Sequence, residues 1–199
     1  MLLLLSKALP TVRRVGAGRL FTPRHCNAVD QTTAEGIPWA ADNEAFDGGF
    51  DPPGWLKMLD KLAGHAEALW VAVPDEVGNH QATLELWERY APEVRARGLP
   101  TAFVLQDGIT SLAEAPACDA LFIGGSTVFK MGSVVRRIVA EAKGREIHMG
   151  RVNTRRRIEY AAAIGCTSFD GTAFARFTDA HAAWGVAHGN QHPQGMLAE

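Results

Sequence analysis

EIHMGRVNTRRRIEYAAAIGCTSFD, residues 146–170, is the stretch that predicts the fold most clearly. The apolar run Glu146–Met149 predicts a short strand, and Thr167–Phe169 predicts a second one. Between them, Asn153–Ile164 is predicted to be a helix, because Asn is a favourable N-cap residue and Gly165 ends the pattern. A strand, a helix and a second strand in this order are typical of a parallel βαβ unit.

The same alternation of short apolar runs and longer amphipathic stretches extends through the rest of the chain. Nearly continuous apolar strands indicate a sheet that is covered on both faces. We therefore predict an α/β fold, specifically a compact TIM-like (β/α) barrel, with an open doubly wound sheet as the alternative closure. The remaining predicted strands are Leu2–Leu5, Pro38–Asp42, Ala68–Val73, Thr101–Leu105 and Ala120–Ile123. The remaining predicted helices are Ser6–Ala17, Trp55–Leu62, Asn79–Arg97, Val128–Lys143 and Asp179–His188.

The chain is short for a complete eightfold barrel. A typical eightfold barrel needs about 250 residues, whereas this chain has 199 and is predicted to form one domain, 1–199. We therefore expect one irregular or missing unit near residues 18–37, where Gly18–His25 is predicted to be a basic loop. Residues 189–199 are predicted to be a flexible tail.

Composition excludes several classes of protein. With 47% hydrophobic residues and a net charge of −2, the chain is typical of a globular protein, and a nucleic-acid surface would have to be a local patch. Three cysteines without a CxxC pair favour neither a disulfide scaffold nor a cysteine zinc site, and they indicate a reducing, cytoplasmic setting. The apolar start Met1–Leu5 lacks the features of a signal peptide. We expect no metal ion, no cofactor and no membrane partner.

Small or polar residues follow almost every predicted strand. Because parallel strands all point their carboxyl ends to the same edge, we expect these residues to form a ring around one pocket. Each of them alone is more readily explained as a turn or a helix cap. The six strand ends are Asp42-Asn43, Pro74-Asp75, Gln106-Asp107, Gly124-Gly125, Met149-Gly150 and Asp170-Gly171.

The chemistry at these strand ends suits a guanine-like edge. The carboxylate of Asp75 can accept from a ring N–H and an exocyclic amine, and the amide of Gln106 can donate to a carbonyl oxygen. Gly124-Gly125 lacks the ending of a phosphate-binding loop but offers bare backbone to a flat ligand. Phe46 and Met149 are predicted to sandwich that ligand, with ordinary core packing as the alternative for each.

Two carboxylates, Asp42 and Asp170, remain for the reaction. One can act as a nucleophile on an electrophilic carbon while the other moves a proton. The C1′ atom of a sugar is such a carbon, because a carboxylate stabilises its cationic transition state. No Ser-His-Asp order and no pair of histidines at metal spacing competes with this interpretation.

The ordered motifs resemble the tRNA-guanine transglycosylase superfamily, and within it the short phage and actinobacterial 7-deazaguanine DNA transglycosylases. Asp42–Asp47 is similar to the base-acid motif Asp-Ser-Gly-Gly-Tyr-Gln of that family, with Phe46 at the stacking aromatic. Gly165–Arg176 is similar to the nucleophile segment Gly-Ile-Asp-Met-Phe-Asp-Cys-Val-Leu-Pro-Thr-Arg. Between these, Asp75 matches the base-reading Asp of the family, and Leu105–Gly108 matches its Val-Gln-Gly segment. Ile123–Gly125 matches its Gly-Gly strand end, and His148–Val152 matches its Leu-Met-Gly-Val-Gly segment.

The chain also departs from the family. Phe174-Ala175 stands where the family has Pro-Thr, and Asn43 stands where it has Ser. The zinc-binding subdomain that follows the nucleophile in the tRNA enzymes, and helps them hold tRNA, has no counterpart in the residues after Arg176. The resemblance therefore implies DNA rather than tRNA as the substrate.

The resemblance implies a TIM-like barrel with pentosyltransferase activity. It would replace guanine in DNA with a free 7-deazaguanine base (preQ0-like) through a covalent sugar–Asp170 intermediate, with Asp42 as the acid and base. We leave open whether the protein forms a homodimer. The expected base-binding residues are Asn43, Phe46, Asp75, Gln106, Gly124, Gly125, Met149 and Gly150, and the expected phosphate contacts are Arg151, Arg155 and Arg176.

Other interpretations stay open. A hydrolytic N-glycosidase that acts on nucleosides or nucleotides would need the same two aspartates, Asp42 and Asp170. A tRNA-guanine transglycosylase, a non-catalytic subunit of a heterodimeric transglycosylase and an unrelated barrel enzyme are further alternatives. For Arg155 and its neighbours, a solvated helix face is the alternative to a phosphate contact.

Overall fold

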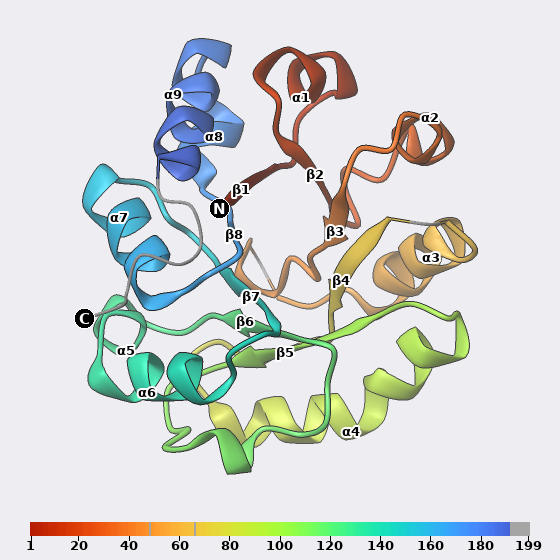
Figure 1. The fold of residues 1–199 in the computed structure, drawn as a ribbon. Coiled ribbons are helices and arrows are strands. Elements are labelled where there is room, and N and C mark those ends of the chain that lie inside the picture. The colour runs from red at the N-terminus through yellow and green to blue at the C-terminus, as the bar shows by residue number, and fades with distance from the viewer. Residues whose placement is uncertain (48, 66, 192–199) are drawn as a thin grey trace.

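A computed structural model of the chain describes residues 1–47, 49–65 and 67–191 and forms a closed barrel of parallel strands (Figure 1). Each strand pairs with the next in sequence, and β1 pairs with β8 to close the ring. The α/β barrel prediction is therefore confirmed. The strands are β1 (Leu2–Leu5), β2 (Gly18–Phe21), β3 (Trp39–Ala41), β4 (Ala68–Ala72), β5 (Thr101–Leu105), β6 (Ala120–Ile123), β7 (Glu146–Met149) and β8 (Ser168–Phe169).

The predicted irregular unit near residues 18–37 is wrong, because Gly18–Phe21 is strand β2 and not a basic loop. Gly18 permits the strand: a Cβ there would lie 2.6 Å from Leu4 Cδ2 and 2.9 Å from the Pro38 carbonyl oxygen. Arg19 is buried, with its guanidinium 5.3 Å from the centre of the Phe21 ring. A complete barrel fits the short chain because its strands have only two to five residues.

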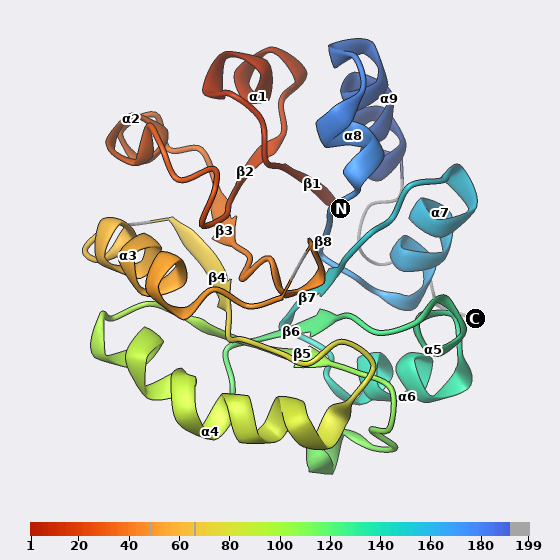
Figure 2. The ribbon, with the colours of Figure 1, turned by 180° about the vertical axis from the view of Figure 1, so that it is seen from behind.

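The helices form an outer ring around the barrel in both views (Figures 1 and 2). They are α1 (Leu9–Val15), α2 (Val29–Ala34), α3 (Pro52–Leu62), α4 (His80–Ala96), α5 (Thr127–Lys130), α6 (Ser133–Glu141), α7 (Arg155–Ile164), α8 (Thr172–Arg176) and α9 (Asp179–Asn190), with short 3₁₀ turns η1 (Ala45–Asp47) and η2 (Leu112–Glu114). None of the helices in the described part of the chain is long and apolar enough to cross a membrane.

Three helix predictions need correction. The predicted helix Val128–Lys143 is two helices, α5 and α6, separated at Met131-Gly132. Helix α7 is capped by the Thr154 hydroxyl rather than by Asn153, whose side-chain oxygen instead accepts from the Ala173 backbone N–H at 2.9 Å. Helix α9 includes Gly189 and Asn190 of the predicted tail, and residues 192–199 lie outside the described residues.

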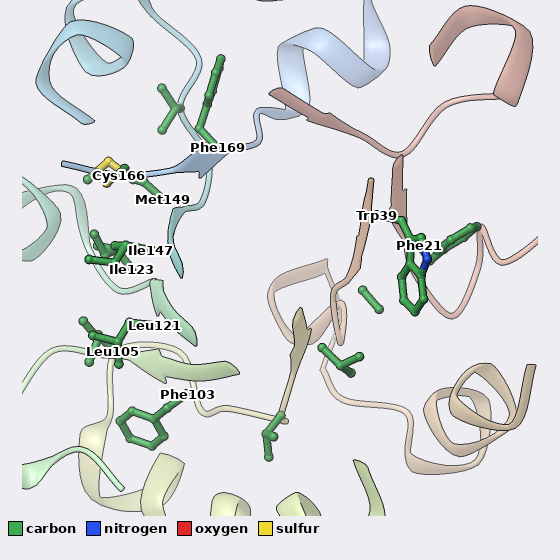
Figure 3. Packing of buried hydrophobic residues seen from close by; sticks show 14 of the residues in the cluster. Phe21, Trp39, Phe103, Leu105, Leu121, Ile123, Ile147, Met149, Cys166 and Phe169 are labelled. Carbon is green, nitrogen blue, oxygen red and sulfur yellow. The ribbon is translucent and has the colours of Figure 1, made fainter. Parts of the chain in front are cut away.

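Alternate residues of each strand pack into two different layers. Outward-facing residues, among them Phe21, Phe103 and Met149, pack between the barrel and the helices (Figure 3). Inward-facing residues fill the barrel interior, where Trp70 of β4 meets Phe122 of β6 edge to face at 5.4 Å between ring centres. This interior layer forms the floor under the carboxyl ends of the strands.

Candidate active site

A pocket of about 470 Å³, its open mouth included, lies at the carboxyl ends of the strands. Its floor is made by Val104 and Phe122 of the barrel interior, and its walls come from the loops that follow β3 to β8. The expected ring of strand-end side chains is therefore present. The other lining residues are Asp42, Asn43, Phe46, Asp75, Val77, Gln106, Gly124, Gly125, Gly150, Arg151 and Asp170.

Asp170, directly after β8, is anchored on one oxygen. Its Oδ2 lies 2.9 Å from His148 Nε2, and the His148 Nδ1 lies 2.9 Å from Ser168 Oγ. Its Oδ1 accepts a longer bond, 3.3 Å, from the Arg151 backbone N–H. The side chain is 16% exposed and lines the pocket.

The sequence predicted no role for His148, which appeared only within a strand and at the start of the His148–Val152 segment. The ring is fully buried inside the barrel, with its centre 4.6 Å from the Trp70 ring and 4.7 Å from the Phe122 ring. One signal was present in the sequence. Met149 and Phe169 are bulky apolar neighbours on their strands, which leaves His148 and Ser168 for the opposite, inward face, and the two residues are partners in the β7–β8 register.

Asp42, directly after β3, lines the same pocket as Asp170. Its Oδ1 accepts from the Asn43 backbone N–H at 2.7 Å. Burial, reinforced by the negative charges of Asp170 and Asp75, raises the pKa of Asp42 to about 7. Near neutral pH this carboxyl group can therefore both give and take a proton.

Asp75 is buried and held by two amides. It accepts from Asn43 Nδ2 at 2.8 Å and from Gln106 Nε2 at 2.6 Å, and burial raises its pKa. The Oε1 atom of Gln106 accepts from the Gly78 backbone N–H at 2.8 Å, which fixes the direction of the Gln106 amide. Asp75, Gln106 and Asn43 thus form one hydrogen-bonded group, which we call the Asp75 cluster.

The Gly124–Ser126 rim approaches this cluster closely. A Cβ on Gly124 would lie 2.7 Å from Gln106 Nε2, and Gly125 has a φ of +72° that favours glycine. Asp107 holds the rim by accepting from the Ser126 backbone N–H at 2.7 Å and from its hydroxyl at 2.6 Å. The rim therefore presents backbone to the pocket without intervening side chains.

Arg151 crosses the pocket instead of pointing out of it. Its guanidinium lies 3.9 Å from the centre of the Phe46 ring and donates to the Gly125 carbonyl oxygen at 2.5 Å. Arg151 covers one face of the Phe46 ring, and the Phe46 side chain remains 58% exposed at the pocket mouth. A flat ligand that stacks on that face must displace the guanidinium.

The turn that carries Gly150 and Arg151 is held by two further cations. Lys130 Nζ donates to the Gly150 carbonyl oxygen at 2.8 Å, and Arg157 Nη1 donates to the Arg151 carbonyl oxygen at 3.3 Å. Burial, together with the positive charge of Arg151, lowers the pKa of Lys130 to about 8. No feature of the sequence predicted a role for Lys130.

Met149 does not belong to the pocket. Its side chain is buried in the layer between barrel and helices (Figure 3), so its predicted stacking role is wrong. The physical reason is the alternation of side chains along β7, which turns His148 inward and Met149 outward. Gly150, the next residue, does line the pocket.

Two predicted phosphate contacts lie outside the pocket lining. Arg155 is exposed at the start of α7 and pairs with Glu159 at 2.7 Å, as in the helix-face alternative. Arg176 is exposed at the end of α8. In the described residues no group of His, Cys, Asp and Glu side chains is arranged to hold a metal ion.

Comparisons with known proteins identify no family for this chain. No family model matches the sequence, and no curated protein is significantly similar to it.

Proposed function

We propose that this protein is a base-exchange transglycosylase that replaces guanine in DNA with a 7-deazaguanine base. The observation that supports it most is one pocket with two carboxyl groups in different surroundings. Asp170 is anchored by His148, whereas the raised pKa of Asp42 makes it a proton carrier near neutral pH. Two carboxyl groups with separate roles are the machinery that substitution at a sugar C1′ requires.

In the first half of the proposed reaction, Asp170 Oδ1 attacks C1′ of the target deoxyguanosine. An ester bond forms while the glycosidic bond breaks, and its electron pair leaves with guanine. The Asp42 carboxyl group gives its proton to the leaving base, so guanine departs neutral and Asp42 becomes a carboxylate. The sugar–phosphate chain stays intact.

The second half reverses these steps with a different base. The ionised Asp42 takes the ring N–H proton of the incoming 7-deazaguanine, whose nitrogen then attacks C1′. The ester bond breaks, and Asp170 leaves as a carboxylate. Kinetics of the ping-pong type follow, because one base must leave before the next enters.

Base recognition falls to the Asp75 cluster. Each Asp75 oxygen accepts one amide hydrogen among the described residues and has the capacity to accept a second, and a guanine edge offers a ring N–H and an amine. The Gly125 carbonyl oxygen and the Phe46 ring, both now contacted by Arg151, provide a further acceptor and a stacking surface. The target base has to leave the DNA stack to reach a pocket at the carboxyl ends of the strands.

Incorporation of labelled guanine into a guanine-containing DNA duplex tests this function. We expect incorporation by the wild-type protein and a fall of at least about 1,000-fold for Asp170→Asn, which keeps the size of the side chain but is a poor nucleophile. Full activity of Asp170→Asn would remove Asp170 from the mechanism. Release of free guanine without incorporation would support the N-glycosidase, and labelling of tRNA but not DNA would support the tRNA enzyme.

A further inference from the structure

We infer that His148 is a positioning residue for Asp170: it holds one carboxylate oxygen so that only the other is presented to the substrate. This inference rests on the proposed function, because it assigns His148 a part in the attack on C1′. It concerns a residue for which the sequence predicted no role.

The geometry around His148 leaves its ring little freedom. The side chain is fully buried, and the rings of Trp70 and Phe122 lie 4.6 Å and 4.7 Å from it. Both ring nitrogens have a polar partner at 2.9 Å, Ser168 Oγ on one side and Asp170 Oδ2 on the other. A buried histidine that is bonded at both nitrogens and packed between aromatic rings is locked in orientation.

The two partners also select the protonation of the ring. Asp170 as a carboxylate has only acceptor atoms, so His148 Nε2 must carry the hydrogen of that bond. In the neutral ring Nδ1 is then an acceptor, and the Ser168 hydroxyl supplies the matching donor. Asp170 therefore fixes the hydrogen of His148 on Nε2, and the Ser168 hydroxyl is compatible with this tautomer because it can donate to Nδ1.

Fixing Oδ2 determines which oxygen of Asp170 reacts. Oδ2 points into the barrel toward His148, whereas within the described residues Oδ1 accepts just the 3.3 Å bond from the Arg151 backbone N–H. When Oδ1 forms the ester with C1′, Oδ2 becomes the carbonyl oxygen and still accepts from Nε2. When the ester breaks, the same bond stabilises the returning carboxylate. His148 thus serves both half-reactions and transfers no proton.

Single-turnover release of guanine from DNA, with the Kd for free guanine measured in parallel, tests the inference. His148→Phe keeps an aromatic ring in the packed site but removes the donor; we expect release to slow by about 100-fold with the Kd changed less than about twofold. His148→Gln, whose Nε2–H reaches toward the same oxygen, should recover about tenfold. The matched control is His181→Phe, a histidine stacked on Phe174 in α9 outside the pocket, which should keep the wild-type rate.

A second readout separates this inference from the proposed function. Nitrogen NMR of the His148 ring should show hydrogen on Nε2 and none on Nδ1, with both signals shifted in Ser168→Ala and the Nε2 signal shifted in Asp170→Asn. A wild-type rate for His148→Phe, or equal losses of rate and guanine affinity without recovery in His148→Gln, would overturn the positioning role. If the wild-type protein exchanges no base, the proposed function fails. Independently of that result, hydrogen on Nδ1 instead of Nε2 in the NMR spectrum would overturn the positioning role of His148.

Discussion

Asp42 sets the pH range in which the proposed chemistry works. Its pKa is raised from 3.8 to about 7, so it is protonated below neutral pH and ionised above it. The first half-reaction needs the protonated form. We expect single-turnover guanine release to fall about tenfold per pH unit above pH 7, measured by rapid quench. A rate that stays flat up to pH 9 would exclude Asp42 as the acid.

The same raised pKa makes a prediction about stability. The folded protein binds more protons at Asp42 than the unfolded chain between about pH 4 and pH 7, so this residue lowers the free energy of unfolding as the pH rises through that window. Asp42→Asn removes the effect. We expect the variant to gain on the order of 4 kcal/mol over the wild type between pH 4 and pH 8 in urea unfolding. A difference that does not change with pH would contradict this.

Arg151 combines a strained backbone with a functional side chain. Its φ of +59° lies in the left-handed region, while its side chain reaches Phe46 and the Gly125 carbonyl oxygen. We expect Arg151→Gly to be more stable than Arg151→Ala by about 1 kcal/mol, because only glycine adopts this φ without strain. Both variants lose the guanidinium, so their thermal unfolding isolates the backbone contribution. Equal stability of the two variants would mean that the turn relaxes in the absence of the side chain.

At the scale of elements, the Gly124–Ser126 rim and the Asp75 cluster are fitted to each other. A methyl group on Gly124 would lie 2.7 Å from Gln106 Nε2 and 2.8 Å from Val104 Cγ1. We expect Gly124→Ala to push the Gln106 amide away from Asp75 and to weaken guanine binding by about tenfold or more, measured by calorimetry.

A double-mutant cycle provides the control for this prediction. Gln106→Ala removes the atom that the new methyl group meets, so adding Gly124→Ala to it should cost little more affinity. Fully additive losses would show that Gly124 acts through Val104 or the backbone instead of through Gln106.

The strands and the strand-end ring could be predicted from the sequence, because short apolar runs that end in polar residues are a local signal. Strand β2 could not, since its four residues include Gly18 and Arg19, which resemble a basic loop. Only the tertiary structure shows that Gly18 makes room for Leu4 and that Arg19 is buried against Phe21. His148 was missed for a related reason: its partners come from β4, β6 and β8, and no local pattern joins them.

At the scale of the whole molecule, the barrel closes where the first strand meets the last. Strand β1 pairs with β8, and helix α9 packs over this seam. Gly185 of α9 is part of that packing: a Cβ there would lie 2.8 Å from the Phe174 ring and 3.1 Å from Leu3. The nucleophile Asp170 follows β8 directly, so the closure of the barrel also positions the site.

Gly185→Ala tests the importance of the seam. The substitution improves helix propensity by about 1 kcal/mol, but the overlap with Phe174 costs more, so we expect a net loss of about 1–2 kcal/mol in urea unfolding. Ala183→Ser, on the exposed side of α9, is the control and should stay within about 0.5 kcal/mol of the wild type. A more stable Gly185→Ala protein would show that α9 packs loosely on the barrel.

The covalent bond between Asp170 and the sugar is the centre of the proposed chemistry, and mass spectrometry of the acid-quenched protein after mixing with a guanine-containing DNA duplex detects it directly. We expect a protein mass increased by the DNA strand minus guanine, mapped to the peptide that contains Asp170, which disappears when free guanine is added and never forms in Asp170→Asn. Base exchange without this species, or the same species on another residue, would contradict the mechanism.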